Sequence, residues 1–240
     1  MTERLGDFAI EGVLGEGGSA IVYAAHEVRE GLPGGTGEPG GRGETGGRGE
    51  PGDRHTEIAL KVLRPELTLS EREVAAFLVE AERVRQVAHP SLVAIRGAGI
   101  LPDGRPYLAM PRLRGECLAE RIARGPMALE TALRLFQGLA LAVAALHAAG
   151  LVHRDIKPEN VFVVGAEEHL VLLDLGIARD LHAPASTTTQ AGLVRGTPAY
   201  MAPERFFGAR ASILTDTYEV AVVLYAMLTA FIAPARKRSE

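Results

Sequence analysis

A stretch of regularly spaced glycines interrupts the chain near its start. Residues 31–54 contain eleven of the 28 glycines and form eight consecutive Gly-X-Y triplets. This stretch has almost no apolar side chains, so it cannot contribute to a hydrophobic core. Gly-X-Y is the collagen period, but a triple helix needs three chains in register, and this tract is short and internal. We therefore expect a flexible insert over 31–55, with the fold built from the segments on either side.

The remainder of the chain has the composition of a globular domain. Of the 240 residues 47% are hydrophobic, which excludes a wholly disordered chain. The net charge of -4 lacks the basic excess of a sequence-blind nucleic-acid binder, so no nucleic-acid partner is expected. The single Cys117 cannot form an internal disulfide, and residues 1–7 lack the apolar core of a secretory signal. Together these features predict a cytoplasmic protein.

Apolar periodicity predicts a small sheet that carries one helix. Residues 8–14, 21–28 and 58–63 are typical of short antiparallel strands. Ser70 and Glu73 then form a capping-box pattern, and the helix that they begin should end before His89-Pro90. Its expected buried face is made of apolar residues at helical spacing, namely Val74, Phe77, Leu78, Ala81 and Val84.

The second half of the chain favours helices. Residues 128–149 are rich in Ala and Leu and predict a long buried helix that Gly150 ends. Residues 220–235 are nearly all apolar, and the basic residues 236–238 follow them within a tail at 233–240. This arrangement resembles a membrane span with a cytoplasmic flank. Because these 16 residues are fewer than the ~20 that a bilayer requires, we expect a core helix, with a membrane-tethered protein as the alternative.

A glycine-rich segment separates the first two predicted strands. Its sequence, Gly15-Glu16-Gly17-Gly18-Ser19-Ala20, would let backbone N–H groups approach a phosphate closely. A dinucleotide-binding loop should open a helix, and a P-loop should end in Gly-Lys-Ser/Thr; neither pattern is present. Taken alone, the segment fits an ordinary hairpin equally well.

Three later motifs, taken in order, resemble those of protein kinases. His153 to Asn160 (HRDIKPEN), Asp174 to Gly176 (DLG) and Gly196 to Glu204 (GTPAYMAPE) are similar to the catalytic loop, the metal-binding turn and the end of the activation segment. From about Phe8 to about Thr229 the chain resembles the bacterial eukaryotic-like Ser/Thr protein kinases. The resemblance implies a two-lobed α+β fold, with an N-lobe at 8–110, a C-lobe at 111–232 and the active site between them.

The resemblance also implies roles for charged residues, because phosphoryl transfer depends on positioning and on charge neutralisation. Lys61 should hold the α- and β-phosphates of ATP and pair with Glu80. Glu82 also qualifies by sequence but reads as a solvated helix charge. Asp155 should act as the base for the acceptor hydroxyl, and Lys157 should neutralise the transferred phosphoryl group and mark Ser/Thr specificity.

Two further residues are expected to bind metal. Asn160 offers a neutral oxygen ligand and Asp174 an anionic one, which suits Mg²⁺, with Mn²⁺ as an alternative. A lone Asp would more simply be a surface charge, but the combination of motifs favours the metal site.

The implied ATP site is an apolar pocket with a few polar contacts. Pro111 follows the gatekeeper position Met110 and retains the carbonyl that would accept from the adenine amino group, while Leu113 N–H would be the donor. The expected lining is Leu14, Gly15, Glu16, Gly17, Gly18, Ser19, Ala20, Val22, Ala59, Lys61, Met110, Pro111, Leu113 and Phe162.

Regulation by phosphorylation is a further expectation. Arg154 beside Asp155 resembles kinases in which a phosphate on the activation loop pairs with this arginine. The candidate acceptors are Ser186, Thr187, Thr188 and Thr189, with Thr189 favoured by its distance from Gly196. A plain polar loop explains the same run equally well.

The C-terminal part departs from the family pattern. Residues 216–229 resemble the central helix of the large lobe, yet the chain ends at Glu240 without the later helices. The expectation is a truncated C-lobe with an exposed apolar surface that a second copy or a partner covers. A catalytically impaired kinase that serves as a nucleotide-binding or interaction module is the alternative function.

Overall fold

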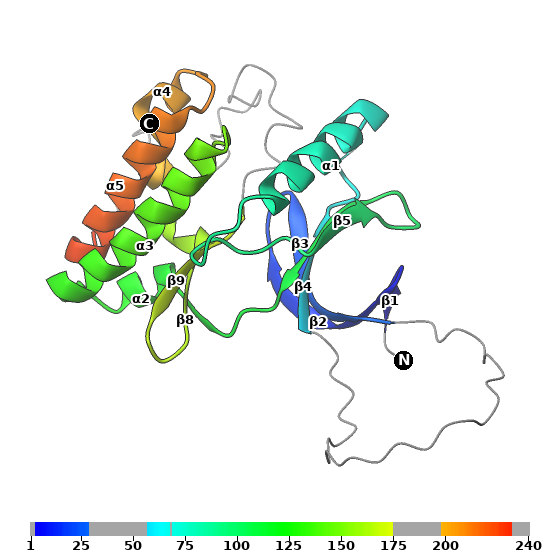
Figure 1. Cartoon of the computed structure of the whole chain (residues 1–240), viewed down its shortest axis with the longest axis horizontal. Helices are drawn as coiled ribbons and strands as arrows, with labels where there is room; N and C mark the ends of the chain where they lie inside the picture. The colour runs from blue at the N-terminus through cyan, green and yellow to red at the C-terminus, as the bar shows by residue number, and fades with distance from the viewer. Residues whose placement is uncertain (1–2, 29–56, 68, 175–197, 232–240) are drawn as a thin grey trace, which may run out of the picture.

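The computed structural model describes residues 3–28, 57–67, 69–174 and 198–231. The chain forms two lobes, one a sheet with a single long helix and the other mainly helical (Figure 1). The predicted two-lobed α+β fold is confirmed. The Gly-X-Y insert, the candidate phosphorylation sites at 186–189 and the basic tail at 233–240 lie outside the described residues.

The N-lobe is built on an antiparallel sheet of six strands in the order β1-β2-β3-β4-β6-β5. The three predicted strands are present, and the apolar face that the sheet turns away from the helix includes Phe8, Ile58, Leu60 and Val62. The short strands β5 and β6 were not predicted. The strands are β1 (Arg4–Leu5), β2 (Phe8–Glu16), β3 (Ala20–Glu27), β4 (Glu57–Leu63), β5 (Gly97–Ile100) and β6 (Pro106–Pro111).

Helix α1 (Glu71–Arg85) covers the other face of this sheet. Ser70 caps it with the predicted capping box, in which Glu73 N–H donates to the Ser70 hydroxyl and Ser70 N–H donates to the Glu73 carboxylate. Phe77, Ala81 and Val84 are buried and share a core cluster with Leu63 of β4. The periodicity therefore predicted three buried residues of this face correctly, whereas Val74 and Leu78, which were also predicted, are half-buried.

The C-lobe combines four helices with a small antiparallel sheet. The sheet has the order β7-β8-β9, with β7 at Gly115–Cys117, β8 at Val161–Val164 and β9 at His169–Leu172. The helices are α2 (Leu118–Ala123), α3 (Leu129–Ala148), α4 (Pro203–Phe206) and α5 (Ile213–Thr229), with 3₁₀ turns η1 (Pro158–Asn160) and η3 (Pro198–Tyr200). Gly150 follows α3 at φ +69°, as expected of the residue that ends a helix.

Helices α3 and α5 pack side by side in the centre of the C-lobe (Figure 1). Helix α5 begins seven residues before the apolar run at 220 because its first turn carries polar residues that face the catalytic loop. Within the described residues, α3 is the one helix whose length and apolar composition would allow it to cross a membrane. It packs against β9 and α5 and buries Leu135, Leu139 and Leu146 completely, as a core helix does.

The register of β7 and β8 leads to a prediction about Gly115. A Cβ placed on Gly115 would lie 2.2 Å from the backbone oxygen of Val163 on the neighbouring strand. We expect Gly115→Ala to lower the free energy of unfolding by ~1–3 kcal/mol, because two strands must move apart. Gly97→Ala is the control, since a Cβ there meets nothing within 4 Å. Urea denaturation of both variants tests this, and equal stabilities would contradict it.

Candidate active site

A cleft of about 570 Å³ lies between the N-lobe sheet and the small C-lobe sheet. Its lining contains most of the residues expected to bind ATP and metal: Leu14, Gly15, Glu16, Gly17, Val22, Ala59, Lys61, Met110, Pro111, Leu113, Asn160, Phe162 and Asp174. Gly18, Ser19 and Ala20 stand outside this lining, and Ala20 is buried in β3. The cleft is therefore walled by residues from both lobes.

The strand register explains how distant residues reach this cleft. Val22 pairs with Lys61 and Ala59 pairs with Met110, so β3, β4 and β6 present adjacent side chains there. Phe162 of β8 approaches from the C-lobe side. Sequence reasoning missed eight lining residues, Val93, Ile95, Leu108, Arg112, Arg114, Gly115, Glu159 and Leu173, most of which belong to loops and strand ends without a motif.

Lys61 and Glu80 do not form the expected pair. The Lys61 ammonium contacts the Asp174 carboxylate, and the Glu80 carboxylate lies 2.9 Å from the Arg154 guanidinium. The pairing predicted between Lys61 and Glu80 is therefore wrong for this conformation. Two cations and two carboxylates share one partly buried region, and either pairing scheme balances their charge, so sequence could not choose between them.

Asp174 is a carboxylate of the cleft whose pKa is shifted by its surroundings. Desolvation raises the pKa, but the nearby cationic groups, the Lys61 ammonium first among them, together outweigh this, and the pKa of Asp174 lies below its ordinary value. Its backbone has φ +53°, in the left-handed region that Asp tolerates better than most residues. Asp174 is therefore held as an anion that faces the cleft.

The catalytic loop places Asp155 between two polar neighbours. The Asn160 amide nitrogen donates to the Asp155 backbone oxygen at 2.8 Å and to the Asp155 Oδ2 at 3.1 Å. The Lys157 ammonium lies 3.3 Å from the same Oδ2. The 3₁₀ turn η1 sets this spacing, because Pro158 begins it and the Asn160 N–H donates to the Lys157 oxygen at 2.9 Å. Asp155, Lys157 and Asn160 thus form one compact group.

Buried His153 supports this group in a neutral form. Its Nε2 lies 2.9 Å from the Leu173 carbonyl oxygen and must therefore be the protonated nitrogen, which leaves Nδ1 to accept the Asp155 N–H. Burial lowers the pKa of His153 below its ordinary value, which agrees with this tautomer. His153 thereby links the catalytic loop to the residue before Asp174.

Two carboxylates on α5 hold the backbone of the catalytic loop. Asp216 accepts from the His153 N–H at 2.8 Å and from the Arg154 N–H at 2.9 Å, and Glu219 accepts from the Ile156 N–H at 2.8 Å. Both carboxylates are buried. Sequence reasoning missed these roles, although two acidic residues spaced i, i+3 in an apolar helix were the available signal.

The anchored catalytic loop contains a residue in the left-handed backbone region, Arg154. This residue has φ +72°, a conformation that costs on the order of 1–3 kcal/mol for a residue other than glycine. The N–H of Arg154 is bound by Asp216 and its guanidinium is paired with Glu80. Contacts at both ends of the residue therefore hold this conformation in place.

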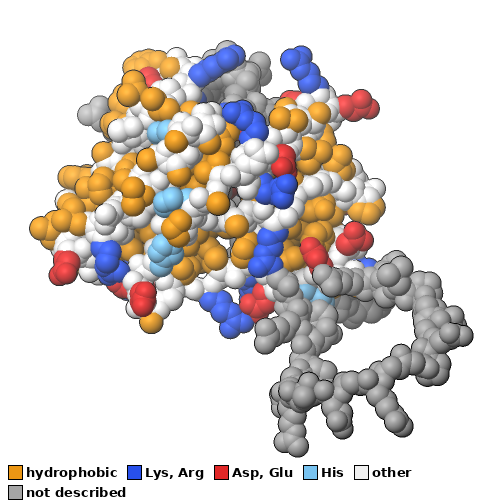
Figure 2. All heavy atoms as spheres, in the orientation of Figure 1, with side chains coloured by type: hydrophobic (Ala, Val, Ile, Leu, Met, Phe, Trp, Pro, Cys, Tyr) orange, Lys and Arg blue, Asp and Glu red, His pale blue; other side chains and the backbone are white. Residues whose placement is uncertain are grey.

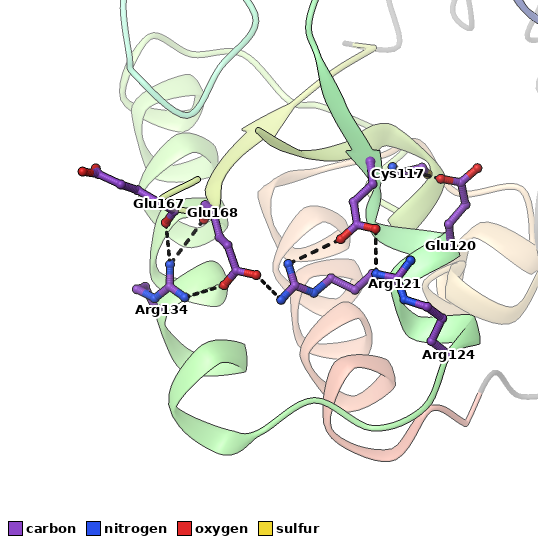
Figure 3. A network of polar contacts seen from close by, with 8 residues as sticks. Cys117, Glu120, Arg121, Arg124, Arg134, Glu167 and Glu168 are labelled. Carbon is purple, nitrogen blue, oxygen red and sulfur yellow. Dashed lines mark hydrogen bonds and ion pairs between the residues drawn. The ribbon is translucent and has the colours of Figure 1, made fainter. Parts of the chain in front are cut away.

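An ion-pair network fixes the turn between β8 and β9 to the helices of the C-lobe (Figure 3). Arg121 of α2 and Arg134 of α3 both point toward Glu168 in this turn, and Arg134 lies 2.7 Å from its carboxylate. Hydrogen bonds from Arg134 and then Arg121 lower the pKa of Glu168. A single exposed ion pair contributes little to stability, but linked pairs restrict the turn that joins β8, the strand of Phe162, to β9.

The donor set fits a hard divalent cation. Asp174 supplies anionic oxygens, and Asn160 keeps its side-chain oxygen because its amide nitrogen donates to Asp155. Among the described residues, no group of three or more His, Cys, Asp or Glu forms a self-sufficient metal cluster. Asp174 and Asn160 alone would be enough for a cation of this kind, which takes one or two protein ligands and completes its shell with phosphate oxygens and water.

Part of the predicted activation segment can be placed. Glu204, the last residue of the GTPAYMAPE motif, accepts a hydrogen bond from the Thr215 hydroxyl at 2.9 Å. Tyr200 is buried, and burial raises its pKa to about 12. Ser186, Thr187, Thr188, Thr189 and Gly196-Thr197 lie outside the described residues, so their roles stay predictions.

Protein kinases have two lobes, and a lysine and an aspartate meet in the cleft between them, as they do here. The family model described as protein kinase domain matches residues 40–239, and the chain belongs to this family. Its relatives are bacterial Ser/Thr kinases, as predicted. The chain is 38% identical over 227 residues to the serine/threonine-protein kinase pkn2 of Myxococcus xanthus, covering 93% of this chain and 24% of pkn2. It is 31% identical over 224 residues to PknL of Mycobacterium tuberculosis, covering 92% of this chain and 49% of PknL.

Solved structures agree on the fold. The kinase domain of Mycobacterium tuberculosis PknI superposes with a TM-score of 0.68 at 22% identity, covering 100% of this chain and 80% of that domain. Rad53 residues 1–466 in complex with AMP-PNP superposes with a TM-score of 0.66 at 22% identity, covering 98% of this chain and 51% of that one. The chain spans less than half the length of the curated relatives named above.

The contacts of α5 predict a large loss of stability when its first buried carboxylate is removed. Asp216 binds two loop N–H groups and also contacts His147 Nε2 at 2.8 Å. Each buried N–H left without a partner costs ~1–3 kcal/mol. We therefore expect Asp216→Ala to lower the free energy of unfolding by ~3–5 kcal/mol. Urea denaturation measures this, and a loss below about 1 kcal/mol would contradict the assignment.

Proposed function

We propose that the protein is an ATP-dependent Ser/Thr protein kinase that transfers the γ-phosphoryl group of ATP to protein hydroxyls and also to itself. The observation that carries this proposal is the cleft in which Lys61, Asn160 and Asp174 meet, with Asp155 and Lys157 at one end. Its volume of about 570 Å³ is within the range of nucleotide and cofactor sites.

The residues divide the work of an in-line transfer. Leu14, Val22, Ala59 and Phe162 would enclose the adenine, while the Pro111 carbonyl and the Leu113 N–H would bind its polar edge. Lys61 would bind the α- and β-phosphates after exchanging its contact with Asp174. The acceptor oxygen attacks the γ-phosphorus, its proton passes to the Asp155 carboxylate, and the bond to the β-phosphate oxygen breaks to release ADP.

Asp174 and Asn160 would hold the divalent metal. When bound, Mg²⁺ supplies charge neutralisation for the phosphates, and Mn²⁺ would fit the same oxygen ligands. Lys157, which lies 3.3 Å from Asp155 Oδ2, would balance charge on the transferred group and keep the base oriented.

Composition and packing support proposals about the substrate class and the cellular location of the protein. The net charge of -4 supports protein substrates in preference to nucleic acid, and the single Cys117 supports a cytoplasmic location. The packing of α3 and α5 into the core supports a location away from the membrane. We propose all three on these grounds.

A second candidate function is a nucleotide-binding or interaction module that does not transfer phosphate. The observation that favours it is the charge pairing of the residues expected to bind ATP: Lys61 contacts Asp174 in the cleft, and Glu80 contacts Arg154 instead of Lys61. If these two pairs persist with ATP bound, Lys61 stays away from the phosphates. Transfer assays separate this module from a kinase.

We also propose that a second copy or a partner protein covers an apolar surface of the C-lobe. Hydrophobic side chains gather over the part of the molecule that contains α3 and α5 (Figure 2). Four large apolar side chains of α5 are exposed, and three of them, Leu214, Tyr218 and Tyr225, which are 71%, 42% and 53% exposed, follow one helical stripe; the fourth is Ile213. Such a continuous apolar stripe is typical of an interaction surface.

The kinase proposal predicts the effect of removing the base. Asp155→Asn should reduce phosphate transfer from labelled ATP and Mg²⁺ by ~10²–10⁴-fold, both to the chain itself and to a generic basic protein, while ATP binding stays. Glu82→Gln is the control, because Glu82 is an exposed helix residue paired with Arg85. Mapping the product should place phosphate within residues 186–189. Equal transfer by the Asn variant, or ATP binding without transfer in the native chain, would favour the module.

The apolar surface predicts self-association or capture of a partner that depends on α5. We expect the native chain to sediment as larger species as its concentration rises, and Leu214→Ser with Tyr218→Ser to shift it toward the monomer. Val79→Ser, which changes a 62% exposed apolar residue on α1, is the control. A native chain that stays monomeric at every concentration would contradict the second-copy form of this proposal.

A further inference from the structure

The glycine-rich turn between β2 and β3 is tied to β4 by one arginine. Arg64 follows β4 directly, and its Nε donates to the Gly17 carbonyl at 2.8 Å. Its Nη2 donates to the Glu16 carboxylate at 2.9 Å, and its backbone N–H donates to the Ser19 carbonyl at 3.0 Å. The last residue of β2 and two residues of the turn are thus bound to a single residue outside it.

These bonds fix which way the turn presents its N–H groups. Gly17 C=O and Gly18 N–H belong to one planar peptide, and the described peptides are all trans, so the two groups point in opposite directions. Because the guanidinium holds the carbonyl, the Gly18 N–H must point away from Arg64. Gly17 N–H is used within the turn, where it donates to the Ala20 carbonyl at 2.8 Å.

The pleat of β4 shows toward which face of the sheet the Gly18 N–H points. Successive side chains of a strand alternate between faces, so Lys61 and Leu63 share one face and Val62 shares the other with Arg64. Leu63 clusters with Phe77 of α1, whereas Val62 clusters with Leu60 and Ile58 on the opposite face. Lys61 lines the cleft. The Gly18 N–H, which points away from Arg64, therefore points toward the face of the sheet that carries Lys61. Gly18 itself lies just beyond the lining of the cleft, next to Gly17, which belongs to it.

We propose that Arg64 is a positioning residue that orients the glycine-rich turn for the phosphates of ATP. This inference rests on the proposed kinase function and extends it to a residue without contact to the nucleotide. Flexible glycines have many accessible conformations, and a charge-assisted bond to the Gly17 carbonyl selects one of them before ATP binds. The strand that carries Lys61 and the turn are thereby held as one unit.

Arg64→Met tests the proposal, because it removes the guanidinium and leaves the backbone N–H and the apolar stem. We expect the dissociation constant of ATP with Mg²⁺ to rise on the order of tenfold in calorimetric titration. The constant for adenosine, which has no phosphate, should stay within about twofold. In turnover assays the KM for ATP should rise while kcat changes little, because the turn would bind the phosphates equally in the ground state and in the transition state.

Matched variants separate positioning from a structural role. Arg105→Met removes an arginine of similar exposure from the same lobe, one that pairs with Asp103 at 2.7 Å, and should leave both constants unchanged. Arg64→Lys should restore ATP binding in part, since the lysine keeps the charge but carries its donors on one nitrogen and lacks the planar fork that reaches the Gly17 carbonyl and the Glu16 carboxylate together. Glu16→Gln, which keeps the Gly17 bond, should weaken ATP binding less than Arg64→Met and serves if that variant fails to fold.

Amide exchange gives a readout that needs no nucleotide. Exchange at Gly17, whose N–H donates to the Ala20 carbonyl within the turn, should be faster in Arg64→Met than in the native chain and in Arg105→Met. If the native chain binds no ATP, the proposed function fails, and this comparison still decides whether Arg64 orders the turn. Equal loss of ATP and adenosine binding, unchanged ATP binding, or unchanged exchange would each overturn the proposal.

Discussion

The catalytic loop depends on carboxylates that come from a distant helix. Asp216 and Glu219 of α5 bind the N–H groups of His153, Arg154 and Ile156, which surround Asp155. A loop in this position has no strand or helix partner for these groups, and burying them unpaired would be costly. Helix α5 therefore does more than fill the C-lobe core, because its first turns set the backbone on which the base, the metal ligand Asn160 and Lys157 are arranged.

Charge balance in the cleft is shared among several pairs. Lys61 contacts Asp174, and Glu80 contacts Arg154, so the residues that would bind phosphate and metal also neutralise each other in this conformation. For Lys61 to bind ATP, its ion pair with the phosphates must be more favourable than its ion pair with Asp174. A metal ion at Asp174 would release the lysine to make this exchange. The same exchange would leave Glu80 with two cations, Arg154 and Lys61, as alternative partners.

The sequence allowed the fold class and most of the cleft to be predicted, because strand alternation, the Ser70 capping box and the motifs around Asp155 and Asp174 are local signals. It could not predict which of two nearby cations Glu80 would contact, since that depends on small shifts of α1 against the C-lobe. The roles of Arg64, Asp216 and Glu219 were also missed. Each acts through backbone groups far away in sequence, and no spacing rule relates a side chain to such partners.

Hydrogen exchange at the catalytic loop tests most directly whether α5 anchors it. Native-state exchange of the His153, Arg154 and Ile156 amides, measured residue by residue in the intact chain, reports the free energy needed to open each hydrogen bond. The account predicts that these three amides exchange as slowly as those of the buried turns of α3, because their acceptors are buried carboxylates. Exchange as fast as that of the exposed turn at Asp103-Gly104 would contradict it.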